Sequence, residues 1–140
     1  MNAVAVIDTN VLVSALLKWD SVPGKILNAI FEGDVIPVYN EEILNEYQIV
    51  LSREKFHFSQ DKITEVLYQI RILGIQETEL VHVIESMPDS KDVVFYSIAL
   101  AHGRTEKTHL VTGNIKHFPS SPIVMSPRDF VEKVLGFPLG

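Results

Sequence analysis

The sequence predicts an α/β protein whose sheet is mostly parallel and has four to five strands. Short aliphatic and β-branched segments alternate with longer segments whose apolar residues recur at helical spacing, which is typical of parallel sheets covered by helices. The segments predicted to form strands are residues 4–7, 35–39, 78–83, 109–112 and 123–125. Because the carboxyl ends of parallel strands meet at one edge of the sheet, we expect a functional site to lie there.

Local signals place helices between these strands. Ser21, Asn40 and Ser59 are good N-caps, and Gly33 and Gly74 are stop signals. The segment that ends at residue 103 is apolar on nearly every side, which predicts a central helix. The predicted helices cover residues 10–18, 21–33, 41–53 and 60–73, a part of 88–103, and a last segment that begins at Ser126.

Length and composition indicate one globular domain, residues 1–140, with 46% hydrophobic and 21% charged residues. The chain has no cysteine, which excludes disulfides, thiol nucleophiles and cysteine-bound zinc. The net charge of −6 argues against a broad basic surface for double-stranded DNA. No apolar run reaches the ~18 residues of a membrane helix, and the N-terminus lacks a secretory pattern. We therefore expect a cytoplasmic protein without membrane association.

The first predicted strand ends abruptly in three small polar residues, Asp8, Thr9 and Asn10. A similar polar turn, TGN at 112–114, closes the strand that begins at His109. Asp8 can cap the helix that follows it, and it can also form one wall of a site at the strand ends. The two roles are compatible, because the turn that ends the strand also aims Asp8 at the edge of the sheet.

Two further acidic residues are candidates for the same site. At about 100° per residue, Glu46 lies at the edge of an apolar stripe that includes Ile43 and Val50. A carboxylate there needs either an arginine or lysine partner or a metal ion. In the segment PDSKD, Asp89 can cap a helix and Asp92 can occupy its first turn. Glu46 and Asp92 therefore each have a structural explanation beside the functional one.

The combination of these residues indicates a chemistry. Asp8, Glu46 and Asp92 lie on three separate elements, and each can point into one pocket at the strand ends. Carboxylates crowded in this way repel one another unless divalent cations neutralise them. Oxygen ligands without cysteine or paired histidines suit Mg²⁺ or Mn²⁺. These ions activate water and bind phosphate oxygens, so the pattern predicts phosphodiester hydrolysis.

Four segments of the chain, taken in order, resemble the motifs of PIN-domain proteins. They are VIDTNVLVSALL, NEEILNEYQIVL, PDSKDVVFYSIALAHG and HLVTGNIKHFP, and the ordered set extends over nearly the whole chain. The closest resemblance is to the bacterial toxin components of toxin–antitoxin systems, the VapC-like ribonucleases. It implies a three-layer α/β/α sandwich and an endoribonuclease that uses one or two Mg²⁺ or Mn²⁺ ions to cut single-stranded RNA. The implied products carry 5′-phosphate and 3′-hydroxyl ends.

Position by position, the resemblance implies that Asp8, Glu46 and Asp92 are the catalytic, metal-binding carboxylates. The residues that it implies in supporting polar roles are Thr9, Asn10 and Thr112. The sequence departs from the family pattern at Asn114, where many members have aspartate. An amide oxygen can still bind a metal ion or its water but adds no charge. Asn114 is therefore a weaker candidate ligand than the three carboxylates.

Substrate contacts are expected among the polar side chains beside the motifs. Lys91 and Lys116 could meet RNA phosphates at the rim of the pocket, and His117 could add a hydrogen-bond donor, although each is more simply explained as a solvated side chain. Phe118 is expected to pack against Pro119 rather than to stack on a base. The resemblance also implies a small antitoxin protein that occludes the pocket, and a homodimer.

A different class of function stays open from the sequence alone. A PIN-like domain with weakened catalysis could serve as an RNA- or protein-binding module, and Asn114 favours this alternative. The retained Asp8, Glu46 and Asp92 count against it, because a degenerate site would be free to lose any of them. Metal binding separates the two alternatives, since an inactive module should bind Mn²⁺ weakly or not at all.

Overall fold

A computed structural model describes residues 2–139 of the chain. Its sheet has five parallel strands in the order β3-β2-β1-β4-β5, which confirms the predicted α/β class. The strands are β1 (Ala3–Ile7), β2 (Val35–Tyr39), β3 (Ile75–Gln76), β4 (His109–Val111) and β5 (Val124–Met125). β1 is therefore the central strand, and a two-residue strand forms each edge.

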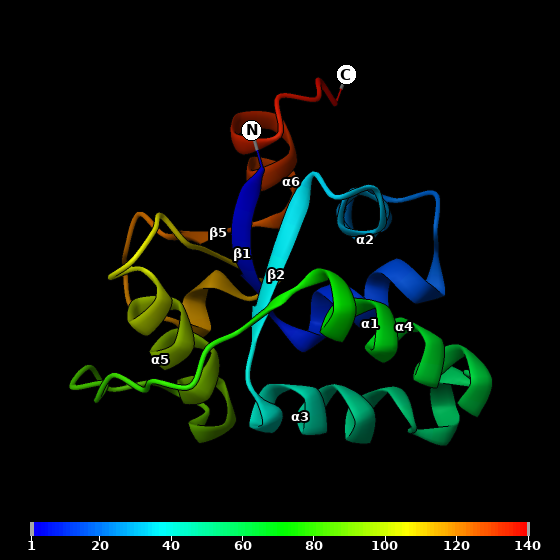
Figure 1. Ribbon diagram of the computed structural model, residues 1–140, viewed down its shortest axis with the longest axis horizontal. Coiled ribbons are helices and arrows are strands. Elements are labelled where there is room, and N and C mark those ends of the chain that lie inside the picture. Colours follow the sequence, from blue (N-terminus) through cyan, green and yellow to red (C-terminus); the bar gives the residue numbers. More distant parts are fainter. Residues whose placement is uncertain (1, 140) are drawn as a thin grey trace.

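Within residues 2–139, the helices are α1 (Thr9–Leu17), α2 (Val22–Glu32), α3 (Glu41–Leu51), α4 (Gln60–Leu73), α5 (Val93–His102) and α6 (Pro127–Asp129). In Figure 1 the strands lie between α5 on one side and α1, α2 and α4 on the other, so the fold has the three layers expected of an α/β/α sandwich. α5 packs against β1, β2 and β4, whereas α2 and α4 pack against β2. Among the described residues, no helix is both long and apolar enough to cross a membrane.

The carboxyl ends of the central strands carry the candidate site. Ile7 of β1 pairs with Val111 of β4, so the next residue of each strand, Asp8 and Thr112, are neighbours. The helix α3 follows β2 directly and lies across this end of the sheet, at the bottom of Figure 1. It contacts α1 and α4 on one side and α5 on the other. Parallel pairing and the position of α3 thus bring distant parts of the chain together.

The ends of the predicted helices agree with their local signals. The side chains of Ser21, Asn40 and Ser59 each accept a hydrogen bond from the backbone N–H three residues later, at 2.8–3.1 Å. Gly33 ends α2 in the left-handed conformation, with φ of 86°, which glycine adopts at no steric cost. Ser126 caps α6, and a π-helical turn, Phe130–Val134, continues that helix.

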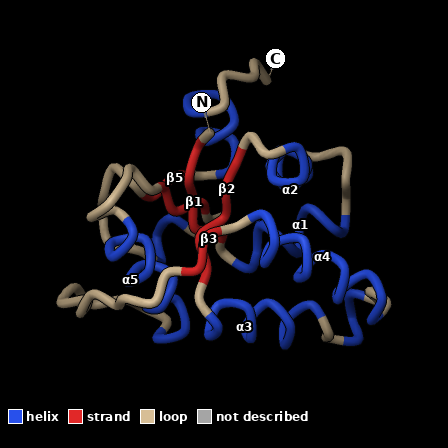
Figure 2. The backbone as a smooth tube through the Cα atoms, in the orientation of Figure 1, coloured by secondary structure: helices blue, strands red, loops and turns tan. Residues whose placement is uncertain are grey.

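The strand predicted at residues 78–83 is wrong. β2 ends at Tyr39, so the chain beyond β3 has no strand beside it with which to pair. The extended segment bonds to α5 instead: the Val81 N–H donates to Ser97 Oγ at 2.9 Å, and Ser97 Oγ donates to the Val81 carbonyl at 2.7 Å. Figure 2 shows this segment as a loop beside α5.

An ionic contact fixes the start of the same segment to the end of α5. His102 is only 6% exposed; its Nδ1 lies 2.9 Å from Glu77 Oε1 and its Nε2 lies 2.7 Å from Glu106 Oε2. Because each ring nitrogen faces a carboxylate acceptor, the surroundings favour the imidazolium form, in which both nitrogens carry a proton. Burial lowers the pKa of His102, but the hydrogen bonds and charges of the two glutamates outweigh it, so the pKa is raised.

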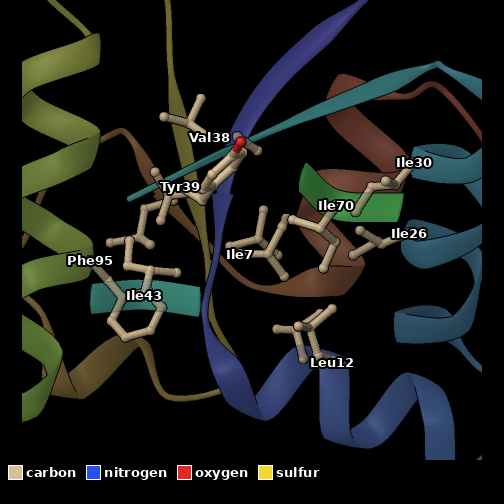
Figure 3. Close-up of a cluster of buried hydrophobic side chains, with 14 of the residues drawn as sticks. Ile7, Leu12, Ile26, Ile30, Val38, Tyr39, Ile43, Ile70 and Phe95 are labelled. Atoms are coloured by element: carbon tan, nitrogen blue, oxygen red, sulfur yellow. The ribbon is translucent and has the colours of Figure 1, made fainter. Parts of the chain in front are cut away.

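Buried aliphatic and aromatic side chains from both helical layers meet at the sheet (Figure 3). Ile7 is 1% exposed and lies among Leu12, Ile26 and Ile70. Its backbone carbonyl accepts a hydrogen bond from the hydroxyl of Tyr47, a buried residue of α3. The last residue of β1 is therefore held from both sides, which gives the residue that follows it a defined position.

Candidate active site

Asp8 lies at the end of the central strand and is 4% exposed. Its Oδ1 accepts a hydrogen bond from the Thr9 backbone N–H at 2.8 Å, which caps α1. Its Oδ2 accepts hydrogen bonds from Thr112 Oγ1 at 2.7 Å and from Asn10 Nδ2 at 3.2 Å. Asp8 thus caps the helix with one oxygen, as the sequence predicts, and presents the other to a polar network.

Thr112 and Asn10 hold Asp8 in place. Thr112 is fully buried, and its Oγ1 also accepts a hydrogen bond from the Asn114 backbone N–H at 3.0 Å. Asn10 Oδ1 accepts a hydrogen bond from the Gly113 backbone N–H at 3.0 Å. A Cβ on residue 113 would lie only 3.3 Å from that oxygen, so glycine suits this close approach. The polar residues after β1 and β4 therefore form one hydrogen-bonded unit.

Glu46 reaches the same end of the sheet from α3 and is half-buried. Its Oε2 accepts a hydrogen bond from Thr9 Oγ1 at 2.7 Å. No lysine or arginine among residues 2–139 lies within ion-pair distance of its carboxylate. Glu46 is therefore hydrogen-bonded to a hydroxyl group, and no lysine or arginine of the described residues neutralises its negative charge.

Asp92 ends the 3₁₀ turn Ser90–Asp92 that leads into α5, and its side chain is 14% exposed. Asp89 caps this turn by accepting a hydrogen bond from the Lys91 backbone N–H at 2.9 Å, as the sequence predicts. Asp92 Oδ2 lies 3.3 Å from His117 Nδ1. His117 thereby contacts one of the candidate carboxylates, so it is not simply a solvated side chain.

Asp8 and Asp92 are harder to ionise than exposed carboxyl groups, because both are buried and lie near other acidic residues. Burial raises the pKa of Asp8 to about 6; the hydrogen bond from Thr112 opposes this rise, and the charge of Asp92 adds to it. The charge of Glu46 raises it further. The pKa of Asp92 is also raised, first by burial and then by the charge of Asp89. A site that resists negative charge in this way favours the binding of a cation.

These side chains line a single cavity of about 380 Å³. Its acidic residues are Asp8, Glu46, Asp89 and Asp92. The other predicted residues that line it are Thr9, Asn10, Lys91, Asn114 and His117. Two predicted residues do not line the cavity. Thr112 is fully buried and contacts Asp8, and Lys116 is exposed on the turn after β4.

The oxygen ligands suit a metal ion, although they are not arranged around one. Within residues 2–139, no three His, Cys, Asp or Glu side chains form a group that could hold an ion as they stand. Asp8, Glu46 and Asp92 are each engaged with a hydroxyl, amide or imidazole neighbour. The donors are carboxylate and amide oxygens, which hard cations prefer. Burial and then the charge of Asp92 raise the pKa of Asp8, and a bound cation would oppose both effects. Binding of an ion would therefore exchange some of these hydrogen bonds for metal–oxygen contacts.

Two residues of the cavity belong to no motif recognised in the sequence. Arg53 and Phe56 lie in the turn after α3 and line the cavity beside the carboxylates. The spacing was a usable signal for one of them, since Arg53 follows Glu46 by seven residues, which is two helical turns. Phe118, by contrast, is buried with its ring centroid 6.5 Å from that of Tyr96, so it packs rather than stacks on substrate.

Comparison with known proteins agrees with this geometry. A family model described as "PIN domain" matches residues 4–116, which include Asp8, Glu46, Asp92 and Asn114. An archaeal relative, "Uncharacterized protein MJ1680" of Methanocaldococcus jannaschii, is 49% identical over 41 residues, or 29% of this chain. That match spans about a quarter, 26%, of the relative's length. The family match covers most of the chain, so the chain belongs to the PIN-domain family, whose members are generally nucleases.

Proposed function

We propose that the protein is a Mg²⁺- or Mn²⁺-dependent endoribonuclease that hydrolyses phosphodiester bonds of single-stranded RNA. The observation that carries the proposal is the meeting of Asp8, Glu46 and Asp92, from three separate elements, in one cavity at the carboxyl end of the sheet. The raised pKa values of Asp8 and Asp92 support it, because carboxylates short of positive charge suit metal ions and their phosphate ligands.

Asp8, Glu46 and Asp92 would hold the ion, and the side-chain oxygen of Asn114 at the rim is a further, neutral candidate. A bound Mg²⁺ or Mn²⁺ supplies Lewis acidity and lowers the pKa of water at the site. Because the amide of Asn114 adds no charge, the site has less negative charge to hold a second ion than one with aspartate at this position.

The chain's own residues orient the reacting groups. Thr112 and Asn10 bind Oδ2 of Asp8 and so determine how this carboxylate faces the cavity. Lys91 and His117 line the rim, where an ammonium group and an imidazole can donate hydrogen bonds to phosphate oxygens. In the reaction, a water oxygen forms a bond to phosphorus and loses a proton, while the bond from phosphorus to the 3′ oxygen breaks and that oxygen gains a proton. The products are 5′-phosphate and 3′-hydroxyl ends.

The charge of the molecule favours single-stranded RNA over a duplex. The chain has a net charge of −6, and the lysine and arginine side chains that line the cavity are Arg53 and Lys91. Duplex binding relies on many phosphate contacts along a basic surface. A flexible single strand can instead enter the site locally.

The same proposal includes a biological role as the toxin of a toxin–antitoxin pair in the cytoplasm. The partner would be a small antitoxin protein that covers the cavity. An arginine of that partner would complement the uncompensated carboxylates through charge-assisted hydrogen bonds. A homodimer of the toxin belongs to this proposed assembly.

Cleavage of a mixed-sequence single-stranded RNA with Mn²⁺ or Mg²⁺ tests the proposal. The wild-type protein is compared with Asp8→Asn and with Asp20→Asn, a matched change at an exposed position outside the cavity. We expect cleavage that EDTA abolishes, that Asp20→Asn retains, and that Asp8→Asn lowers by about two orders of magnitude, as on removal of a contact to transition-state charge. Thermal melting confirms that each variant is folded.

A second candidate is a catalytically weakened RNA- or protein-binding module. The neutral Asn114 at the rim favours it, together with the absence of a ready metal-holding group among residues 2–139. Wild-type protein that neither cuts RNA nor gains thermal stability from Mn²⁺ would favour the binding module. Stabilisation by Mn²⁺ without RNA cleavage would instead mean that the metal site is right and the substrate is wrong.

A further inference from the structure

Arg53 and Phe56 line the cavity and are not among the proposed metal ligands. Arg53 is exposed, and no carboxylate within residues 2–139 lies at ion-pair distance from its guanidinium, although the cavity beside it is acidic. Phe56 is half-buried and adds a phenyl ring to a lining made mostly of polar residues. A guanidinium and an aromatic ring beside one another match the two chemical parts of a nucleotide, phosphate and base.

The turn holds Phe56 in a defined position. The Phe56 N–H donates to the Arg53 carbonyl at 3.1 Å, and the His57 N–H donates to the Glu54 carbonyl at 3.0 Å. His57 has φ of 57°, a left-handed conformation that is uncommon for residues other than glycine. The ring of Phe56 stacks on that of Phe58, with centroids 5.8 Å apart and planes inclined by 19°. Phe58 packs against the core, so its stacking on Phe56 anchors the Phe56 ring to the body of the protein.

The Phe56 ring also contacts a cation that substrate could replace. Lys55 Nζ lies 5.1 Å from the centroid of the ring. Lys55 is exposed, and a contact between an ammonium group and a ring is weak where water reaches both. Every nucleobase offers a π face to an aromatic side chain.

We infer that Phe56 is a stacking site for the nucleobase beside the scissile phosphate, and that Arg53 binds the adjoining phosphate through its planar fork of donors. This inference rests on the proposed function, because the same RNA strand is the ligand. Since only an unpaired base can offer its face to Phe56, the subsite selects single strands over duplexes.

The test compares Phe56→Leu and Phe56→Tyr with Tyr68→Leu, which removes an exposed aromatic ring of α4 outside the cavity. A short RNA with 2-aminopurine at one position is titrated into each variant in an Asp8→Asn background, in which we expect hydrolysis to be slow enough for binding to be measured. The fluorescence of 2-aminopurine falls when it stacks on an aromatic ring. KM and kcat are then measured with Asp8 restored, on the same RNA and on RNA with an abasic nucleotide at that position.

We expect quenching with the parent, Phe56→Tyr and Tyr68→Leu proteins, and its loss with Phe56→Leu. Phe56→Leu should raise KM about tenfold, in line with the loss of one base–aromatic stack, and should change kcat far less. On the abasic RNA its KM should equal that of the parent. Arg53→Gln should also raise KM and flatten its dependence on salt, whereas Arg104→Gln, the same change at an exposed position after α5, should not.

Two outcomes separate this inference from the proposed function. If the parent protein cuts no RNA but quenching still depends on Phe56, the nuclease assignment fails and the stacking site stands. If Phe56→Leu quenches and cuts RNA as Tyr68→Leu does, the stacking site is overturned and the nuclease assignment stands. Melting curves that match the parent establish that Phe56→Leu is folded, and the recovery with Phe56→Tyr assigns the effect to the aromatic ring.

Discussion

Asp8 combines a structural and a chemical position in one side chain. One oxygen caps α1, and the other receives hydrogen bonds from Thr112 and Asn10. Capping alone does not explain a buried charge, because serine or asparagine caps a helix as well. No cation within residues 2–139 lies at ion-pair distance from its carboxylate, and burial raises its pKa to about 6. The residue is therefore destabilising when ionised without a metal ion.

Replacement of Asp8 by asparagine should alter how stability depends on pH when divalent ions are absent. The pKa of Asp8 rises from 3.8 to about 6 on folding, so its stabilising contribution is complete below pH 3.8 and is lost as the pH rises through 6. Relative to wild type, the free energy of unfolding of Asp8→Asn should gain about 3 kcal/mol between about pH 4 and pH 8. Urea denaturation in EDTA measures this difference.

The exposed Asp20→Asn serves as the control for that series, and its difference from wild type should be flat across the same range. Asparagine at position 8 cannot make every hydrogen bond that aspartate makes, and this lowers the free energy of unfolding of the variant by the same amount at every pH. The prediction therefore concerns only how the difference between variant and wild type changes with pH. A difference between Asp8→Asn and wild type that does not change with pH would show that the carboxyl group is not held at a raised pKa.

Thr112 should tune the metal affinity of Asp8 without touching the ion. Its hydrogen bond lowers the pKa of Asp8, so Thr112→Val should raise that pKa and let protons compete better with metal. The pH at which half of the Mn²⁺ binding is lost should move upward by about one unit. Thermal stabilisation by Mn²⁺, measured across pH, reports this shift. Thr112→Ser keeps the hydroxyl and should behave as wild type; equal shifts in the two variants would point to packing instead.

Among single residues, the sequence predicts best those whose contacts are with neighbouring residues in the chain. Asp8 and Asp89 cap the turns that follow them, which is a property of the neighbouring backbone. The hydroxyl partner of Glu46 and the contact of His117 with Asp92 depend on how α3 and the turn after β4 dock, and no local pattern encodes that. For the same reason the sequence does not single out the turn after α3 as part of the cavity.

Among the elements, helices were predicted more closely than edge strands. The bounds of α2, α3 and α4 lie within two residues of those expected, because capping side chains and glycines act over three or four residues. The segment at 78–83 has a strand-like composition, but a strand also needs a neighbour, and β2 ends too early to provide one. Ser97 of α5 satisfies its backbone instead.

The contact of His102 with Glu77 and Glu106 should stabilise the fold most at mildly acidic pH. His102 has a raised pKa, so its contribution is complete below its ordinary value of 6.5 and is lost as the pH rises through the folded value. Glu77 has a lowered pKa, chiefly through the Glu79 backbone N–H, so its contribution is present above 4.5 and is lost in stronger acid. His102→Gln should therefore lower the free energy of unfolding by about 2 kcal/mol between these values.

Denaturant titrations of His102→Gln and wild type at several pH values measure this window. The matched control is His82→Gln, an exposed histidine of the segment that follows β3, which should leave stability unchanged within about 0.5 kcal/mol. If His102→Gln lowers the free energy of unfolding by the same amount up to pH 9, the ring stabilises the fold through packing rather than through its charge.

For the whole molecule, the net charge of −6 predicts weak dependence of RNA binding on salt. The cations at the rim of the cavity are Arg53 and Lys91, so about two phosphates are neutralised, and the logarithm of affinity should fall with the logarithm of salt at a slope of about −1.4. Fluorescence anisotropy of a labelled RNA with the Asp8→Asn protein measures the slope between about 50 and 200 mM KCl. A slope steeper than about −4 would reveal a basic RNA track outside the cavity.

The class of the fold followed from the alternation of strands and helices, but the order of the strands did not. Periodicity shows that a segment is a strand and says nothing of which strands flank it. The placement of β1 between β2 and β4 depends on pairs such as Ala5 with His109, which are far apart in the chain. The site inherits this dependence, because Asp8 and Thr112 meet only when β4 lies beside β1.

The sequence separation between Asp8 and Thr112 also delays the completion of the proposed active site during synthesis. The hydrogen bond between Asp8 and Thr112 joins residues 104 apart, so a growing chain has its first carboxylate long before the strand that orients it. At about 5–20 residues per second, translation separates the two by on the order of ten seconds. Until β4 has left the ribosome, the proposed ribonuclease is incomplete. During that interval the nascent chain carries Asp8 without the Thr112 hydroxyl that orients it.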